Sequence, residues 1–276
     1  MLSYRHAFHA GSFADVLKHA VLVHVLRHAV LKPKPVYYLD THAGAGSYDL
    51  TSAMAAKTGE WRAGIAPVMA ATDPPELPRS LLELVAAANP QGELRAYPGS
   101  PALARAVLRP QDRIELVELH GSDHGLLEAW SGGGALVRRV DGLAALVHRL
   151  PPPERRGVVL IDPSYEIKTD YEDVVAALAR AHRRFATGAF LLWYPVIDRA
   201  RTEALLADLR ATCIPRQLRL EICARPDAAG RGMTGAGMLV VNPPWTLADA
   251  AMLGLPWLAR VLDAQNRWQV TWNTPP

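Results

Sequence analysis

The chain has 276 residues, half of them hydrophobic, and a formal net charge of +3. A chain of this length and composition can bury a large core as one sizeable domain, which excludes intrinsic disorder, and its mild basic excess permits an anionic partner. Its apolar runs are too short to span a membrane, its start lacks the apolar segment of a secretory signal, and its two cysteines are too few for a disulfide framework, so we expect a cytoplasmic protein with reduced thiols and no metal site.

The first residues, 4–13, mix aromatic, cationic and imidazole groups. Such a mixture stacks on nucleic-acid bases and contacts phosphates, although a terminus that packs its aromatic rings on the core is an alternative. A helix is predicted to follow over about residues 14–31, with apolar residues at three- and four-residue spacing. His24 and His28 share its apolar face, and we interpret them as structural because no third ligand completes a zinc motif.

A short strand over residues 36–40 is predicted to run into a loop that contains Gly44 and Gly46. Glycine allows a backbone to come close to a ligand. A dinucleotide-binding loop needs a third small residue where its helix opens, and the residues after Gly46 provide none. The strand and loop are more similar to the nucleoside-binding segment of a methyltransferase that uses S-adenosylmethionine.

Residues 50–95 have a helical pattern, broken by glycines and by a proline-rich turn, with no strong strand. We interpret them as an inserted helical subdomain. Residues 1–49 then carry the N-terminal tail, the first helix and the glycine loop of the main domain, and residues 96–276 carry the remainder of that domain. Ser100 is predicted to cap the helix after the insertion, with Pro101 in its first position, and ligand contact is the alternative role for Ser100.

After the insertion, strands and helices alternate in the rhythm of a doubly wound α/β sheet. In such a sheet, Glu118 is placed to grip ribose hydroxyls, Asp141 and Gly142 lie where an adenine ring would sit, and Asp162 ends the fourth strand. Each carboxylate alone could be a solvated strand end, but their order after the glycine loop is more specific. Strands are predicted at 113–119, 136–140, 157–161, 188–194, 218–224, 237–241 and 268–272, and helices near 122–130, from 142, near 170–185, from 198, and before the last strand.

The fourth strand ends in Asp162-Pro163-Ser164-Tyr165. The Asp162 carboxylate and the Pro163 carbonyl can accept the N–H hydrogens of an amine on a flat ring, which localises the nitrogen lone pair, while the ring of Tyr165 stacks on the base. The segment resembles the Asp/Asn-Pro-Pro-aromatic signature of methyltransferases that act on adenine N6 or cytosine N4, except that Ser164 replaces the second proline. An ordinary Asp-Pro turn after a strand is the alternative interpretation.

A second segment, Asn242-Pro243-Pro244-Trp245, matches that signature better. The strand before Asn242 is predicted to pair antiparallel with its predecessor. We therefore expect Asn242 at the opposite edge of the sheet from Asp162, away from the cofactor, so that Asp162 carries the chemistry.

Several further segments extend the resemblance along nearly the whole chain, which is similar to the bacterial 23S ribosomal RNA adenine-N6-methyltransferase J family (RlmJ-type). The segments are Met1 to His6, Phe8 to Gly11, Asp15 to His19, Tyr38 to Gly46, Tyr97 to Pro101 and Trp193 to Pro195. The resemblance implies a class I methyltransferase Rossmann-like fold with a small helical insertion. It also implies that a monomer acts on one adenine of naked 23S rRNA with S-adenosylmethionine, which leaves as S-adenosylhomocysteine.

The same resemblance implies site residues beyond those found from the strand ends. Tyr4, His6 and Tyr165 are expected to contact the substrate RNA, and Asp162, Pro163 and Tyr165 to form the catalytic group. The cofactor contacts are expected to be Lys18, His19, His42, Gly44, Gly46, Ser100, Glu118, Asp141, Gly142 and Asp162.

Three other functions stay open at this point. A DNA adenine-N6 methyltransferase shares the chemistry, although an insertion of fewer than fifty residues is small for reading a duplex. A relative that binds RNA but is catalytically impaired is an alternative because Ser164 loosens a loop that proline would stiffen. A nicotinamide-dependent dehydrogenase fits the coarse fold, but the glycine loop suits a pyrophosphate poorly.

Overall fold

The computed structural model describes residues 5–167, 169–227, 232–265 and 267–275. Its main sheet has eight strands in the order β10-β8-β9-β7-β6-β1-β4-β5. The strands β1, β4, β5, β6 and β7 are parallel, and the remaining three are antiparallel to their neighbours. The strand bounds are β1 Tyr37–Asp40, β4 Arg113–Val117, β5 Leu136–Arg138, β6 Gly157–Ile161, β7 Ala189–Val196, β8 Gln217–Cys223, β9 Gly235–Val241 and β10 Trp268–Thr274. The predicted α/β sheet is confirmed.

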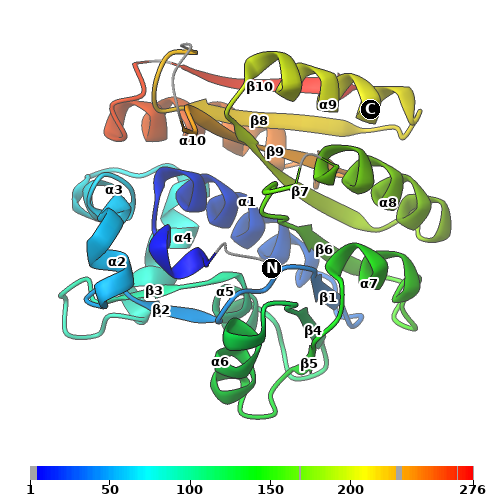
Figure 1. Ribbon diagram of the computed structural model, residues 1–276, viewed down its shortest axis with the longest axis horizontal. Coiled ribbons are helices and arrows are strands. Elements are labelled where there is room, and N and C mark those ends of the chain that lie inside the picture. Colours follow the sequence, from blue (N-terminus) through cyan, green and yellow to red (C-terminus); the bar gives the residue numbers. More distant parts are fainter. Residues whose placement is uncertain (1–4, 168, 228–231, 266, 276) are drawn as a thin grey trace.

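Helices cover both faces of this sheet, as Figure 1 shows. Along β6, Val158 and Leu160 pack into the core on one face, and Val159 and Ile161 pack into the core on the other. Because both faces are buried, the central strands are continuously apolar instead of alternating with polar residues. The helices α1 Phe13–Ala29, α4 Glu76–Ala87, α5 Ser100–Val107 and α10 Leu247–Val261 belong to the first core, and α7 Gly142–His148, α8 Asp170–Arg184 and α9 Arg199–Ala211 to the second.

Helix α1 is buried on every side from Ala14 to Leu26, not along a single stripe. It lies between the sheet and the helices α4 and α5. Ser12 begins the helix, because its hydroxyl accepts a hydrogen bond from the Asp15 backbone. This all-round burial brings Lys18 into the interior, where a charge is stable only when it is paired.

The segment between residues 50 and 95 contains helices but no strand among the described residues. These helices are α2 Ala53–Thr58, the 3-10 turn η2 Glu60–Arg62, α3 Ile65–Ala70 and α4. A two-stranded antiparallel sheet closes the segment, with β2 Ser47–Asp49 on one side and β3 Ala96–Pro98 on the other. Leu77, Leu81 and Val85 of α4 belong to the first core, so this segment packs on the main sheet's helices.

The predicted position of Asn242 is confirmed. Strand β9 runs antiparallel to β7, with Val241 opposite Phe190, so Asn242 lies where the parallel strands begin and Asp162 lies where they end. The Asn242 side-chain amide donates hydrogen bonds of 2.8 Å and 2.9 Å to the carbonyls of Ala186 and Gly188, just before β7. The better match to the methyltransferase signature is therefore a turn that anchors two strands.

The predicted cap of α5 is wrong. Gly99 occupies the N-cap position, Ser100 is the first helical residue, and no side chain caps the helix. The Ser100 hydroxyl is hydrogen-bonded to the Asp40 carboxylate instead. The Ser100 side chain therefore bonds to a buried carboxylate and not to the backbone of its own helix, because the end of β1 lies beside the start of α5.

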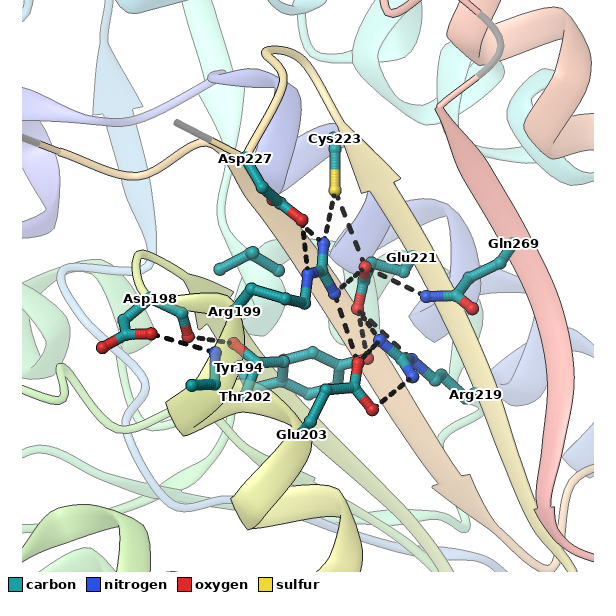
Figure 2. Close-up of polar contacts among 12 residues, drawn as sticks. Tyr194, Asp198, Arg199, Thr202, Glu203, Arg219, Glu221, Cys223, Asp227 and Gln269 are labelled. Atoms are coloured by element: carbon teal, nitrogen blue, oxygen red, sulfur yellow. Dashed lines mark hydrogen bonds and ion pairs between the residues drawn. The ribbon is translucent and has the colours of Figure 1, made fainter. Parts of the chain in front are cut away.

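A buried ionic network joins the C-terminal strands, as Figure 2 shows. Glu221 of β8 accepts hydrogen bonds from Arg199 at 2.6 Å, from Arg219 at 2.7 Å and from the Tyr194 hydroxyl at 3.0 Å. Tyr194 belongs to β7 and Arg199 to α9. The network therefore fixes β7, whose carboxyl end borders the site described next.

Candidate active site

A cavity of about 350 Å³ opens at the carboxyl ends of β1, β4, β5 and β6, beside Trp193 of β7. Most of the residues that line it come from loops directly after strands, where a doubly wound sheet binds its ligands. The lining residues are His6, Lys18, His19, His42, Ala43, Gly44, Tyr48, Gly99, Ser100, Glu118, Leu119, His120, Asp123, Asp141, Gly142, Leu143, Asp162, Pro163, Ser164, Ile167, Asp170 and Trp193.

The glycine loop follows β1 and turns tightly against the cavity. Gly44 and Gly46 have φ of +61° and +85°, which a side chain would strain. A Cβ on Gly44 would overlap the Tyr48 hydroxyl, which accepts a hydrogen bond from the Ala45 backbone. Gly46 packs against the Trp130 ring and does not line the cavity, so its predicted cofactor contact stays a prediction.

Glu118 follows β4 and holds the glycine loop in place. One carboxylate oxygen accepts the Gly44 N–H at 2.9 Å and the other accepts the His120 N–H at 2.7 Å. Burial raises the pKa of Glu118, although both hydrogen bonds oppose the shift. Asp141 caps α7 through the Ala144 N–H at 2.7 Å, and thereby fixes the next wall of the cavity.

Gly142 brings α7 close to the loop after β1. A Cβ at this position would overlap the Thr41 carbonyl and would come within 3.0 Å of the His42 ring. The predicted pair of Asp141 and Gly142 thus forms a close-fitting side of the cavity, as a flat ring requires.

Lys18 and Asp162 line the floor of the cavity, and the buried Asp15 lies behind them. Lys18 Nζ lies 2.6 Å from Asp162 Oδ2 and 2.9 Å from Asp15 Oδ1, and its side chain is 4% exposed. Burial alone would lower the pKa of Lys18, but Asp15 and Asp162 raise it well above its ordinary value, so the group is charged. Burial raises the pKa of Asp162, against the opposing effect of Lys18.

The N-terminal segment covers one side of this floor. His6 Nε2 lies 2.9 Å from Asp15 Oδ2, and Arg5 forms an ion pair of 2.7 Å with Asp123 of α6 Gly121–Ser131. His6 therefore reaches the cavity and the Lys18 cluster together. Tyr4, the other residue predicted to contact RNA here, lies outside the described residues.

Two histidines in the cavity wall are neutral at pH 7. Burial lowers the pKa of His19 to about 3 and that of His42 to about 4. His19 Nδ1 lies 2.8 Å from the Tyr97 hydroxyl, and His42 Nδ1 lies 2.8 Å from the Thr41 hydroxyl. Both rings can therefore bind a ligand through hydrogen bonds without adding charge.

Asp40 lies behind this wall, at the end of β1. It receives hydrogen bonds from the Ser100 hydroxyl and, at 2.8 Å, from the Tyr38 hydroxyl. Burial raises the pKa of Asp40 to about 6, against the effect of both bonds. The carboxyl group ties the glycine loop to α5.

The loop after β6 places Asp162, Pro163 and Ser164 on the cavity and turns Tyr165 away from it. Tyr165 has φ of +54° and is 8% exposed, and its hydroxyl donates a hydrogen bond of 2.9 Å to the Trp193 carbonyl. Its ring packs against Tyr171, with centroids 4.6 Å apart. The predicted stacking of Tyr165 on a base stays a prediction, and it requires the ring to leave this position.

Sequence reasoning missed several residues of this site. Asp15 gave a usable signal, since it stands three residues before Lys18, the spacing at which helical side chains meet. Trp193 lies on the parallel strand after β6, so its strand position was also a signal. Tyr48 reaches the cavity from the three-residue strand β2, and His120, Asp123 and Asp170 reach it from helix starts, where no periodic pattern marks them.

Two absences concern the described residues only. In that part of the chain, no group of three or more His, Cys, Asp or Glu side chains is placed to hold a metal ion. No described helix is long and apolar enough to cross a membrane.

Comparison with known proteins gives matches over almost the full chain. The sequence profile of the family described as "Ribosomal RNA large subunit methyltransferase D, RlmJ" matches residues 33–274. A protein of Escherichia coli strain K12 named "Ribosomal RNA large subunit methyltransferase J" is 48% identical over 279 residues, covering 100% of both chains. A Haemophilus influenzae protein of the same name is 45% identical over 280 residues, again with 100% of both chains covered.

A solved structure has the same fold. The crystal structure of a Legionella pneumophila protein superposes with a TM-score of 0.88 at 37% identity, covering 96% of this chain and 97% of that one. The full-length identity, the profile match and the common fold agree with the strand-end carboxylates and the glycine loop seen here. This chain therefore belongs to the RlmJ family of ribosomal RNA large subunit methyltransferases.

Proposed function

We propose that this protein transfers a methyl group from S-adenosylmethionine to the N6 amine of one adenine in 23S rRNA. The observation that carries the proposal is the placement of Asp162 at the cavity floor, paired with Lys18, on the strand next to the glycine loop. The names of the relatives support a substrate in large-subunit RNA.

The cavity fits the methyl donor. Its volume of about 350 Å³ lies in the range of small-molecule sites. Glu118 would accept the ribose hydroxyls, and Gly142 leaves room beside the His42 ring for a flat base. When bound, S-adenosylmethionine supplies an electrophilic methyl group on a sulfonium centre and leaves as S-adenosylhomocysteine.

Asp162 acts on the adenine amine as a hydrogen-bond acceptor. Lys18 holds one carboxylate oxygen, which orients the group. When Asp162 accepts an N–H from the amine, the lone pair localises on the nitrogen and points at the methyl group. The gain in rate depends on how accurately the amine is placed. The amine nitrogen would form the new bond to the methyl carbon, the sulfur would keep the electron pair of the carbon–sulfur bond, and the proton released by the nitrogen would pass to solvent.

Lys18 has a second task in this scheme. Without it, Asp15 and Asp162 would be two buried carboxylates close to one another, and one of them would take up a proton. The ammonium group keeps Asp162 ionised, and an ionised carboxylate accepts hydrogen bonds without offering a donor.

Further aspects of the proposal follow from the substrate. Naked 23S rRNA, and not the assembled subunit, is proposed because a buried cavity needs an adenine that can leave its stack. Methylation of ribosomal RNA places the enzyme in the cytoplasm. All the described residues that line the cavity belong to one chain, which supports the proposal that a monomer acts.

The test is methylation of an unmodified 23S rRNA transcript with labelled donor, followed by digestion and identification of the nucleoside. Wild-type protein should produce N6-methyladenosine. Asp162→Ala should lose at least about a hundredfold in kcat, the typical effect of removing one aligned group at the reacting centre. Asn242→Ala, a control in the Asn242-Pro243-Pro244-Trp245 segment, should keep the wild-type kcat per folded molecule, as measured by circular dichroism beside the assay. Loss of activity in the control alone would transfer the catalytic role to Asn242.

Two controls separate this function from its alternatives. Methylation of duplex DNA in place of RNA would identify a DNA methyltransferase. Donor binding in calorimetry without any methylated base would identify an impaired relative that binds RNA.

A further inference from the structure

The Asn242-Pro243-Pro244-Trp245 segment leaves one side chain without a structural role. Asn242 anchors β7 and Pro243 is buried, but Trp245 is 79% exposed. Among the large hydrophobic side chains that the structure describes, it is the most exposed, and Leu31 follows at 77%. A tryptophan that contributes so little to the core points to a contact outside the chain.

Basic groups lie on the segments next to this tryptophan. The His28 ring stands edge-on to Trp245, with centroids 6.5 Å apart and an interplanar angle of 83°. Burial lowers the pKa of His28, and the nearby charge of Lys32 lowers it further. Arg216 is exposed and donates a hydrogen bond of 3.3 Å to the Pro243 carbonyl, so it borders the same segment.

The loop that follows His28 carries Lys32 and Lys34 and is held in shape. Residues 31–35 read Leu-Lys-Pro-Lys-Pro and are all exposed. Arg109 donates hydrogen bonds to the Val30, Lys32 and Lys34 carbonyls, and Arg156 donates to the Lys34 and Ala29 carbonyls. Two guanidinium groups thus hold the backbone of this loop in place. Binding a ligand through Lys32 and Lys34 would therefore cost little backbone entropy.

Nearby carboxylates do not cancel this positive charge. Asp112 is bound by Arg109, Glu154 by Arg113 and Glu83 by Arg27. Asp249, in the first turn of α10, is the exposed carboxylate closest in sequence to Trp245. Glu76, which is exposed and whose charge partly offsets the lowering of the His24 pKa by burial, is a second carboxylate near this surface. Lys32, Lys34 and Arg216 outnumber these two carboxylates, so the surface remains basic.

Helix α1 connects this surface to the active site. Lys18 contacts Asp162 near the helix start, and His28 contacts Trp245 near its end. Ten residues of α-helix rise about 15 Å. A structured RNA can span that distance, so one molecule can reach both places.

We propose that the Trp245 surface, made of His28, Leu31, Lys32, Lys34, Arg216 and Trp245, binds the RNA substrate away from the target adenine. An unpaired base stacks on Trp245, and flanking phosphates pair with Lys32 and Lys34. This inference rests on the proposed function, because it takes RNA as the partner. It adds a second RNA contact, at the edge of the sheet opposite the active-site cavity.

The test compares Trp245→Ala, Trp245→Phe and a Lys32→Glu/Lys34→Glu double variant with wild-type protein on the unmodified 23S rRNA transcript. Trp272→Ala, on the edge strand β10 and 40% exposed, is the matched control. Equilibrium RNA binding, donor binding, KM and kcat are measured for each. Trp245→Ala should raise Kd and KM for RNA about tenfold, the effect of one stacked base, and leave kcat and donor binding unchanged.

The other variants separate stacking from charge. Trp245→Phe should keep most of the affinity, since a phenyl ring still stacks. The double lysine variant should reduce the slope of log K against log salt by about two, one unit for each phosphate contact. Trp272→Ala should behave as wild type.

Each outcome decides between the two proposals. Unchanged RNA affinity in Trp245→Ala and in the lysine variant, with methylation intact, would overturn the second contact while the enzyme's function stands, and would leave a protein partner for this surface. RNA binding that depends on Trp245 without any methylation would support the contact and contradict the proposed reaction. Wild-type protein that binds no RNA would contradict both.

Discussion

The Glu221 network offers a stability prediction whose size follows from the contacts. Glu221 has a side chain 2% exposed and lies between Arg199 and Arg219 (Figure 2). Glu221→Gln keeps the volume but removes the charge, and it places an NH₂ donor opposite a guanidinium donor. Breaking a buried ion pair by removing one partner costs about 3–5 kcal/mol. Because Arg199 is 28% exposed and water can reach it, we expect the lower end, about 3 kcal/mol.

Glu203→Gln is the matched control for this change. Glu203 contacts the same Arg219, at 2.8 Å, but its side chain is 49% exposed, so its loss should cost about 1 kcal/mol or less. Urea unfolding at pH 7, followed by circular dichroism, gives both free energies of unfolding. Equal losses in the two variants, or a loss below about 1 kcal/mol in Glu221→Gln, would refute the argument that burial decides the cost.

Two further predictions concern the catalytic loop and the response to acid. Ser164→Pro should change single-turnover methylation by less than about twofold, because the Tyr165 hydroxyl already ties the loop to β7; a clear gain in rate would mean that the loop is loose in solution. Burial alone would raise the pKa of Asp15 and of Glu221, but neighbouring cations hold both below their ordinary values. The folded state keeps His19 and His42 neutral, so below about pH 6.5 the unfolded state binds more protons and the free energy of unfolding should begin to fall, an effect of two histidines that the raised pKa of Asp40 offsets only in part. Asp15 and Glu221 stabilise the fold while they are ionised, so the fall should become steeper below about pH 4.5. A urea series across this range measures it, and an unchanged free energy at pH 4 would contradict the assignment.

The succession of strands along the chain could be predicted from the sequence because each central strand is a short apolar run bounded by breakers. The run from Gly157 to Ile161 is an example, since a strand buried on both faces needs no polar alternation. The carboxylates Glu118, Asp141 and Asp162 could be placed on one cavity for the same reason, because parallel strands end at the same edge. Asn242 was separated from them by the antiparallel pairing alone.

Other parts of the site could not be predicted from local patterns. Ser100 stands just before Pro101, as a helix cap often does, but its hydroxyl bonds to the Asp40 carboxylate once β1 and α5 are packed. Tyr165 stands where the methyltransferase signature has its stacking aromatic residue, but its ring packs between Tyr171 and Trp193. In both places a tertiary neighbour competes with the local preference.

The sequence by itself determined the α/β order, the glycine loop and the strand-end carboxylates, because these depend on periodicity and on residues with special backbone freedom. Only the tertiary structure decided the charge state of the site. Lys18 and Asp162 are 144 residues apart, and they meet because α1 packs against the sheet with its N-terminal turns beside the end of β6. A buried ammonium group and a buried carboxylate each need the other, and that pairing is a property of the packed fold.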